Sequence, residues 1–328
     1  MDTVLALLGI TPVARWQSSS LMDAAEACTE TYLTGVPNIQ FMPSPFMQEG
    51  QFLVSKVSAG SDRSLKEVIK RAIDAIGGLD KVVEHGNKVT IKPNLNTADP
   101  YPASSDLAFI EALVELVLEA GASKVEIVES SMMRLSTREV AEKVGIVGVA
   151  DRLGVDLTFL DEHDWTKVFF PRGKFLKSGS IGRPLLEIEK VILAPCLKTH
   201  FLARYTGSMK LLMGWLRPRE RIRMHVRNLE FKIADLASYF SPDLIVMDAR
   251  TCFIEGGPAS GKCSHPGLVL ASGDMVSIDV EGVRIIQSCG GHNKIPADVW
   301  SLPQIRRAVD IGIGAQTDDD IRLVEMLD

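Results

Sequence analysis

The stretch that decides the fold runs from residue 88 to residue 121 and begins Lys88-Val89-Thr90-Ile91-Lys92. These five residues have the β-branched, apolar composition of a short strand. A loop rich in Pro and Asn follows, and apolar residues then recur at helical spacing from Phe109 to Leu118 before Gly121 ends the pattern. The segment therefore predicts one strand–loop–helix unit of an α/β protein.

The same alternation continues on both sides of this stretch. Ser64 and Glu67 have the spacing of a capping box and predict the start of a helix that ends at Gly77. Short apolar strands are expected at residues 52–57, 125–128, 155–160, 191–194, 244–247 and 267–270. Alternation of this kind predicts an α/β fold in which a mostly parallel or mixed sheet has helices on both faces.

The domain organisation follows from the same pattern. Residues 1–51 have weak periodicity and are expected to form an N-terminal extension. Residues 52–328 are expected to form the α/β unit, either as one body or as two lobes around a cleft, with a lobe boundary near 172–184.

Composition and charge exclude several classes of protein. Of the 328 residues, 42 are acidic and 36 are basic, which gives a formal charge of −6. Nucleic-acid and membrane-surface binders need an excess of Lys and Arg, so neither class is expected. The five cysteines are far apart, odd in number and without a Cys-x-x-Cys pair, which favours reduced thiols over disulfides or an iron–sulfur site. The first ten residues are apolar but include no Lys or Arg, and a cytoplasmic protein is expected.

The first candidate site residues follow the strand at 88–92. Lys92 ends that strand, and Asn94 comes after the Pro that fixes the turn, so the loop could hold a carboxylate or a phosphate. The alternative is that Lys92 is a solvated strand end and Asn94 an ordinary turn residue.

A denser group of candidates follows the predicted strand at 191–194. It contains Lys198, His200, Thr206, Ser208 and Lys210. Thr206 or Ser208 could cap a helix whose N-terminal N–H groups face an anion. Lys210 in the first turn opposes the helix dipole unless an anionic ligand compensates it, so this group predicts an anion site.

Two further groups complete the candidates. Arg221 and His225 lie four residues apart on a predicted helix and could point into the same crevice. Asp274 is expected to cap a helix, and Asp279, inside that helix, would need a cationic partner if it were buried. Residues 255–262 form a Gly-rich loop that departs from the phosphate-loop pattern at Cys263 and is better explained as a mobile flap.

In their order along the chain, these motifs resemble the domain of unknown function 362 family. The motifs are Val89 to Leu95, Leu197 to His200, Thr206 to Gly214, Arg221 with His225, Gly257 to Gly261 and Asp274 to Asp279. The resemblance covers roughly residues 52–290 and implies no settled chemistry, although some members are joined to ferredoxin-like segments that this sequence lacks. Leu211 and Glu281 depart from the family pattern, which puts the identity of the substrate in doubt.

A fainter analogy connects the sequence to nickel-dependent lactate racemases. That analogy implies that Lys210 stands where such enzymes tether their cofactor, and that His200 or His225 acts as an acid or base. The sequence itself requires no cofactor and contains no metal-ligand set of diagnostic spacing. It leaves a metal or a Lys-linked cofactor open.

The leading hypothesis is an enzyme that transfers a proton on a small anionic metabolite, as in isomerisation, racemisation or elimination. In this hypothesis Lys210, His200 and His225 are the catalytic residues. The substrate would be bound by Lys92, Asn94, Lys198, Thr206, Ser208, Arg221 and Asp279. The alternative is a carrier of a ligand or cofactor, or a redox accessory that docks to an iron–sulfur partner. A homo-oligomer is compatible with either hypothesis.

Overall fold

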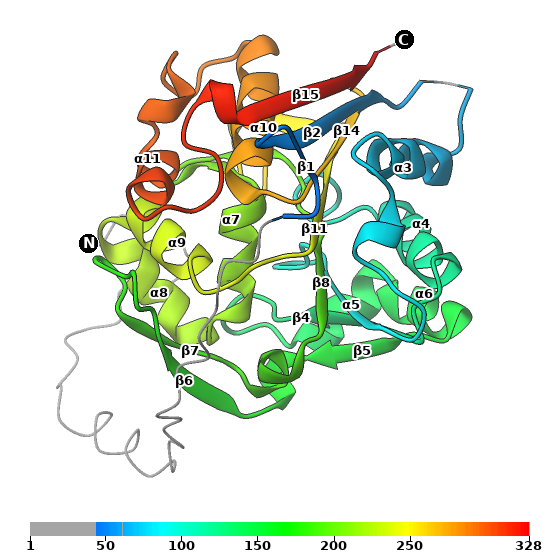
Figure 1. Ribbon diagram of the computed structural model, residues 1–328. Coiled ribbons are helices and arrows are strands. Elements are labelled where there is room, and N and C mark those ends of the chain that lie inside the picture. Colours follow the sequence, from blue (N-terminus) through cyan, green and yellow to red (C-terminus); the bar gives the residue numbers. More distant parts are fainter. Residues whose placement is uncertain (1–43, 61, 328) are drawn as a thin grey trace, which may run out of the picture.

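One mixed sheet organises the protein, whose computed structural model describes residues 44–60 and 62–327. The strand order is β1-β2-β14-β11-β8-β3-β4-β5, and β15 also pairs with β2 (Figure 1). These strands span Met47–Gln48 (β1), Gln51–Ser58 (β2), Lys88–Lys92 (β3), Lys124–Glu129 (β4), Asp156–Phe159 (β5), Lys190–Leu193 (β8), Leu244–Ala249 (β11), Leu268–Ser272 (β14) and Ile321–Met326 (β15).

The direction of chain progression reverses between β3 and β8. From β3 the chain moves to β4 and β5 on one side, whereas β8 and β11 lie on the other side. These five strands are parallel to one another, so their carboxyl ends meet at one edge of the sheet. A reversal of this kind opens a crevice for a ligand beyond those carboxyl ends.

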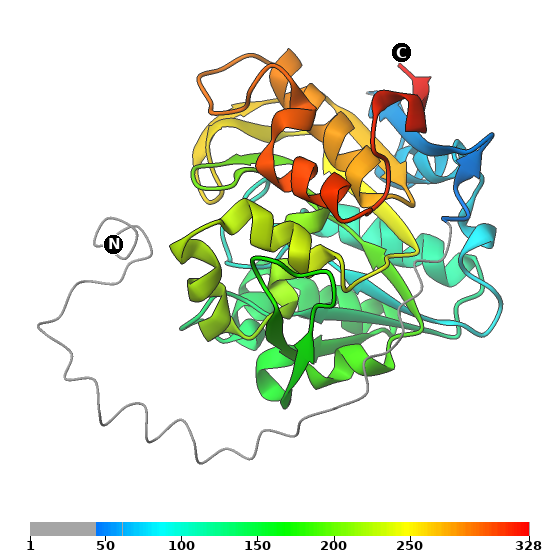
Figure 2. The same ribbon diagram turned by 60° about the vertical axis from the view of Figure 1, so that its left-hand side comes forward.

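Helices cover both faces of the sheet. On one face lie α3 (Leu65–Asp74), α4 (Leu107–Glu119), α5 (Thr137–Val144) and α6 (Ile146–Leu153). On the other face, which Figure 2 brings forward, lie α7 (Ser208–Leu211), α8 (Pro218–Val226), α9 (Leu229–Ala237), α10 (Met275–Ser288) and α11 (Pro303–Asp310). Residues 244–247 of β11 are all apolar because both faces of the strand are covered. Leu244 and Val246 lie in one core, and Ile245 and Met247 lie in the other.

The described residues also form three short hairpins outside the main sheet and several single turns of 3-10 helix. The hairpins pair β6 (Trp165–Phe169) with β7 (Ser178–Gly182), β9 (Lys198–His200) with β10 (Arg204–Thr206), and β12 (Cys252–Gly256) with β13 (Gly261–Ser264). The 3-10 turns are Leu79–Lys81 (η1), Leu160–Glu162 (η2), Arg183–Glu187 (η3), Leu212–Trp215 (η4), Val299–Ser301 (η5) and Asp318–Asp320 (η6).

The structure confirms the predicted fold class and the helix starts at Ser64 and Asp274. The N-cap of α7 is Gly207, so the expected cap by the side chain of Thr206 or Ser208 is wrong. Each of the expected strands is present, and Ser64, Asp106 and Asp274 cap α3, α4 and α10 by accepting backbone N–H groups. In the described part of the chain, no helix is both long enough and apolar enough to span a bilayer.

The structure describes only the last part of the expected N-terminal extension, from residue 44 onward. Most of the expected N-terminal extension lies outside the described residues. The sheet nevertheless begins before residue 52, because β1 pairs with β2 and Phe46 is fully buried in the core. Two lobes with a boundary near 172–184 remain a prediction. That segment includes β7, whose Ile181 packs in the same core as α9 and α10.

Candidate functional site

The candidate site lies at the carboxyl ends of the parallel strands, on both sides of the reversal between β3 and β8. Lys92 ends β3, and Glu129 ends the neighbouring β4. The β9–β10 hairpin follows β8 closely and carries Lys198, His200 and Thr206. The topology thus brings together two of the predicted groups that are far apart in the sequence, together with Glu129.

Lys92 is held in an ion pair inside the protein. Its Nζ lies 2.6 Å from Oε2 of Glu129 and donates to the carbonyl of Pro93 at 2.9 Å. Both charged side chains are buried, and Glu129 also accepts two backbone N–H groups. Gly214 packs so closely that a Cβ there would lie 2.8 Å from Lys92 Nζ. Lys92 therefore joins the ends of β3 and β4, and its charge is already neutralised.

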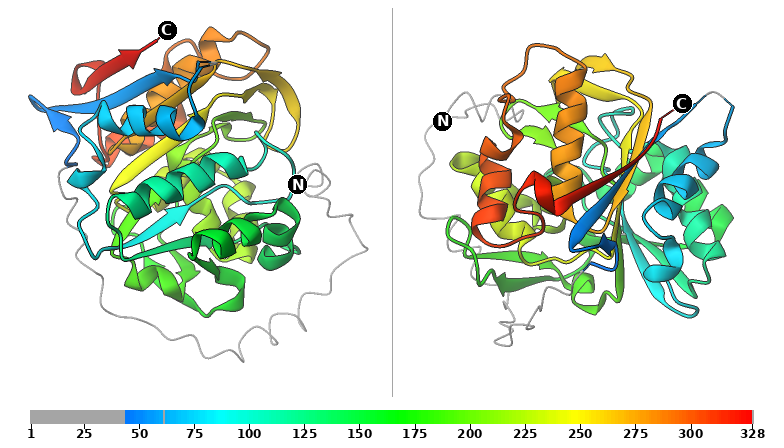
Figure 3. Two further views of the ribbon diagram at one scale, coloured as in Figure 1. Left: turned by 90° about the vertical axis from the view of Figure 1, so that its right-hand side faces the viewer. Right: turned by 45° about the horizontal axis from the view of Figure 1, so that its top comes forward.

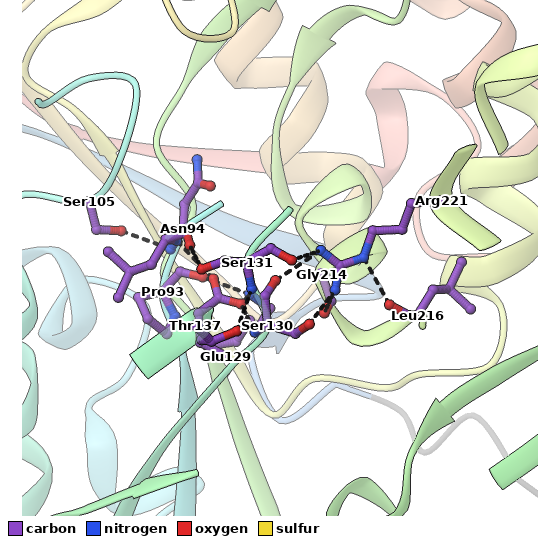
Figure 4. Close-up of polar contacts among 12 residues, drawn as sticks. Pro93, Asn94, Ser105, Glu129, Ser130, Ser131, Thr137, Gly214, Leu216 and Arg221 are labelled. Atoms are coloured by element: carbon purple, nitrogen blue, oxygen red, sulfur yellow. Dashed lines mark hydrogen bonds and ion pairs between the residues drawn. The ribbon is translucent and has the colours of Figure 1, made fainter. Parts of the chain in front are cut away.

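Arg221 uses all of its hydrogen-bond donors within the protein (Figure 4). Nε donates to the carbonyl of Leu216 at 2.8 Å, and Nη1 donates to the carbonyls of Ser130 and Ser131 at 2.9 and 3.0 Å. Nη2 donates to the carbonyl of Gly214 at 2.6 Å and to Ser130 Oγ at 2.7 Å. A guanidinium carries five N–H donors, so none is left for a ligand. Arg221 acts on the site by fastening α8 and η4 to the end of β4.

Lys198 keeps one donor that is not used by the described residues. Its buried Nζ donates to the carbonyls of Pro102 at 2.9 Å and Ala103 at 2.6 Å. An ammonium carries three N–H groups, so one remains. Burial lowers the pKa of Lys198 to about 8. The loop that supplies the two carbonyls is anchored by Tyr101, whose hydroxyl donates to Asp248 Oδ1 at 2.8 Å.

Lys210 is a cation without a protein partner among the described residues, since its ammonium makes no hydrogen bond or ion pair there. Burial lowers its pKa to about 7, and the charges of Lys198 and Arg221 add to the effect. Near neutral pH the amine is therefore divided between its charged and neutral forms. The charged form needs an anion that the described residues do not supply.

His200 is held in one neutral tautomer. Its Nδ1 accepts the backbone N–H groups of Leu202 and Ala203, both at 3.1 Å. Because Nδ1 accepts, these hydrogen bonds assign the ring proton to Nε2. Burial, and then the charge of Lys210, holds the pKa of His200 well below its usual range. His200 thus offers an N–H donor.

His225 has the opposite arrangement. Its Nδ1 lies 2.6 Å from the backbone carbonyl of Arg221, which can only accept, so Nδ1 carries the proton and Nε2 keeps a lone pair. Burial and the charge of Lys210 lower the pKa of His225 to about 4. The two imidazole rings are 6.4 Å apart between centroids. They combine one N–H donor with one acceptor, and the charge of Lys210 acts on both.

Two neutral side chains add unused polar atoms. Thr206 lies directly opposite Lys198 in the β9–β10 hairpin, so the two side chains share a face. Its buried Oγ1 has no hydrogen-bond partner among the described residues. Asn94 is bound through its backbone N–H to Ser105 Oγ at 2.8 Å, and its side-chain amide makes no contact to the residues drawn in Figure 4. Both can contact a ligand without breaking an existing bond.

The carboxylate of Asp279 binds the free N–H groups at the start of α7, where an anionic ligand was expected. Its Oδ1 accepts the backbone N–H and the hydroxyl of Ser208 at 2.6 and 2.8 Å. Its Oδ2 accepts the N–H of Met209 at 3.4 Å and the hydroxyl of Tyr205 at 3.2 Å. The expected cationic partner is therefore replaced by neutral donors, because free N–H groups at a helix start can stabilise a buried carboxylate. Ser208 and Asp279 position α7, and the hydroxyl of Ser208 is already engaged.

A pH dependence of stability follows for Asp279. Burial raises its pKa to about 6, above the ordinary value of 3.8. A raised pKa means that the folded state holds the proton more tightly, so the contribution of Asp279 to stability is lost as the pH rises from about 4 to 6. We expect the wild type to lose about 3 kcal/mol relative to Asp279→Asn over this range. Urea unfolding of both proteins at several pH values measures the difference, and a constant difference would contradict the assignment.

Some residues of the site were not predicted. Glu129, Ser130 and Ser131 bind Lys92 and Arg221, and none of them is among the predicted site residues. They follow the predicted strand at 125–128 directly, which is the criterion that singled out Lys92. Applying that criterion to every strand would have found them.

The predicted flap forms the turn of the β12–β13 hairpin. It packs against β9, where a Cβ on Gly257 would lie 1.9 Å from the carbonyl oxygen of Thr199. Its mobility remains a prediction. Within residues 44–60 and 62–327, no three His, Cys, Asp or Glu side chains form a group that could hold a metal ion.

Comparison with known proteins places the chain in a family. Residues 89–284, more than half of the chain, match the model of the domain of unknown function 362 (DUF362). The chain belongs to the DUF362 family. Every candidate residue from Lys92 to Asp279 falls within the matched DUF362 range, which confirms the resemblance drawn from the ordered motifs.

One further protein and one solved structure are similar to this DUF362 protein. A thylakoid-associated protein of Synechocystis sp. is 22% identical over 291 residues, which cover 76% of this chain and 87% of that protein. A solved structure, the lactate racemase apoprotein of Thermoanaerobacterium thermosaccharolyticum, aligns with a TM-score of 0.49 and 14% identity. The alignment covers 76% of this chain but only 59% of the racemase chain.

Proposed function

We propose that this DUF362 protein is an enzyme that transfers a proton on a small metabolite bearing a carboxylate or a phosphate. One observation carries the proposal. Lys210 is a cation without a partner among the described residues, and it is surrounded by other positive charges and two neutral histidines. Such a site is completed by an anion, because a desolvated charge without a partner is costly.

The donors that remain free define how the anion would be bound. Lys198 contributes its third N–H, Lys210 its ammonium, Thr206 its hydroxyl and Asn94 its amide. Arg221 supports this group from outside the anion site, because all of its donors go to protein atoms. Lys92 is paired with Glu129 and donates two of its three N–H groups to protein atoms. A small carboxylate or phosphate has enough acceptor oxygens to satisfy several of these donors at once.

The same residues can move a proton. An amine with a pKa of about 7 can accept a proton near neutral pH, and Nε2 of His225 offers a second acceptor. The Nε2–H of His200 can donate to an oxygen that becomes negative during the reaction. Isomerisation, racemisation and elimination all begin with such a transfer. No step in this scheme uses a cofactor, and a metal or a Lys-linked cofactor stays open.

Exchange of substrate hydrogen with deuterium tests the proposal without knowledge of the product. The wild type is incubated in deuterated buffer with a panel of 2-hydroxy acids, 2-oxo acids and phosphorylated hydroxyketones, and proton NMR follows the loss of carbon-bound hydrogen. We expect exchange with at least one member of the panel. His225→Asn keeps a donor for the carbonyl of Arg221 but removes Nε2, and it should slow exchange about 100-fold or more.

A surface variant controls for non-specific effects of substitution. Lys70→Ala removes an exposed lysine that pairs with Asp74 on α3, on the opposite face of the sheet from α7 and α8, and should exchange at the wild-type rate. Absence of exchange for every compound, together with absence of anion binding by calorimetry, would contradict the enzyme proposal.

A second candidate function rests on the outer face of α8. Arg219 and Arg223 are exposed there, four residues apart, in a chain whose overall charge is negative. This face favours a carrier or redox accessory that docks an acidic partner, as in the alternative hypothesis. Docking through exposed arginines would weaken steeply with added salt, whereas binding in an enclosed anion site would change much less. A cytoplasmic location remains a prediction for either function.

A further inference from the structure

Three cysteines that are far apart in the sequence meet at the base of the β12–β13 hairpin. Cys252 begins β12, Cys263 lies in β13, and Cys289 follows the last residue of α10. Cys252 is buried, Cys289 is partly exposed and Cys263 is exposed. No role in the proposed anion chemistry is assigned to any of them.

Cys252 and Cys289 are in contact. Cys289 packs against the core that contains Cys252, and the two thiols are close enough for Cys289 to add to the raised pKa of Cys252. The chain after Cys289 stays beside β12, because Asn293 Nδ2 donates to the carbonyl of Ile254 at 3.0 Å. A Cβ on Gly291 would lie 3.2 Å from the same carbonyl oxygen. The chain that follows Cys289 is therefore anchored to β12 directly after Cys252.

The register of the hairpin separates Cys263 from this pair. Cys252 lies opposite Ser264, and Phe253 lies opposite Cys263. Successive residues of a strand point to opposite faces, so Cys252 and Cys263 lie on opposite faces of the hairpin. This explains why one thiol is buried and the other exposed, and it leaves Cys289 as the partner of Cys252.

We propose that Cys252 and Cys289 are a peroxide-sensitive dithiol that closes to a disulfide between β12 and the end of α10. Cys289, the more exposed of the two, attacks hydrogen peroxide and becomes a sulfenic acid with release of one water molecule. The sulfur of Cys252 then attacks that of Cys289, and the sulfenic oxygen leaves as a second water molecule. Two thiols and one peroxide thus give one disulfide and two water molecules.

The proposal is independent of the anion chemistry, but the disulfide would lie close to the candidate site. The hairpin packs against the backbone of Thr199, between Lys198 and His200 in β9. Oxidation would therefore fix the position of a segment that contacts the wall of the site. Burial raises the pKa of Cys252 to about 12, so Cys252 is a poor first nucleophile and the peroxide is expected to react at Cys289.

Differential labelling of the wild-type chain tests the pairing without any substitution. The protein is treated with hydrogen peroxide, its free thiols are blocked with iodoacetamide under denaturing conditions, and the reduced disulfides are labelled with N-ethylmaleimide. We expect the second label on Cys252 and Cys289 in equal amounts, and a mass loss of about 2 Da in the intact oxidised chain. Buried Cys196, bonded to Ser105 rather than to another thiol, should take only the first label.

Variants distinguish this pair from the other thiols. Cys263→Ser should form the disulfide like the wild type, whereas Cys289→Ser should not form it. A Cys28→Ser background removes the cysteine that lies outside the described residues. The proposal is overturned if Cys263 is found in the disulfide, or if peroxide oxidises Cys263 to a sulfenic acid while Cys252 and Cys289 stay reduced.

Discussion

Lys210→Ala is expected to abolish proton exchange on the anionic substrate while the protein still folds. The substitution removes the partnerless ammonium and with it both a charge for the anion and an amine with a pKa near 7. Loss of a positioned base costs about 10²- to 10⁴-fold in rate. Deuterium exchange measured with the active member of the panel gives the rate, and calorimetry gives the affinity for the anion.

Lys210→Arg separates the two roles of the side chain. Arginine keeps the positive charge but does not become neutral near pH 7, so anion binding should survive while exchange is lost. In the wild type, exchange should rise with pH through about 7 as the amine loses its proton, and anion affinity should fall over the same range. Wild-type exchange in Lys210→Ala would show that another residue is the base.

Arg221→Lys is expected to lower the free energy of unfolding by about 3–5 kcal/mol. A lysine has three donors in place of five and cannot reach the oxygens of Leu216, Gly214 and Ser130 in one planar arrangement. Buried carbonyls would then lose their partners. Urea unfolding monitored by circular dichroism measures the change.

Arg223→Lys is the matched control for this prediction. Arg223 lies two residues further along the same helix and is exposed, so its substitution should change the free energy of unfolding by less than about 0.5 kcal/mol. Equal stability of the two variants would mean that the Arg221 contacts contribute little to folding.

Much of the fold could be predicted from local sequence patterns. Runs such as 244–247 are apolar at every position, which is the pattern of a strand covered on both faces, and β11 is covered in this way. Helix starts were predictable because Ser64 and Asp274 have side chains that accept backbone N–H groups three residues later.

The use of each cation could not be predicted in the same way. Lys92, Lys198, Lys210 and Arg221 have equivalent positions after strands or in the following helices, yet they differ in how many donors remain free. That number depends on carbonyls and carboxylates supplied by segments that are distant in sequence. Asp279 illustrates the same limit, because its partners lie about 70 positions earlier in the chain.

The pairing of β2 has a consequence for how the protein is made. Figure 3 shows β15 running beside β2, and Lys56 in β2 pairs with Glu325 across 269 positions of the chain. The strand β14, which pairs with β2 in the antiparallel direction, also lies far from β2 in the sequence, at residues 268–272. At about 5–20 residues per second, synthesis of the intervening chain takes roughly 15–50 s. During translation β2 lacks β14 and β15 for that time and has only the short pairing with β1, so most of its backbone N–H and C=O groups wait for partners that are made near the end of synthesis.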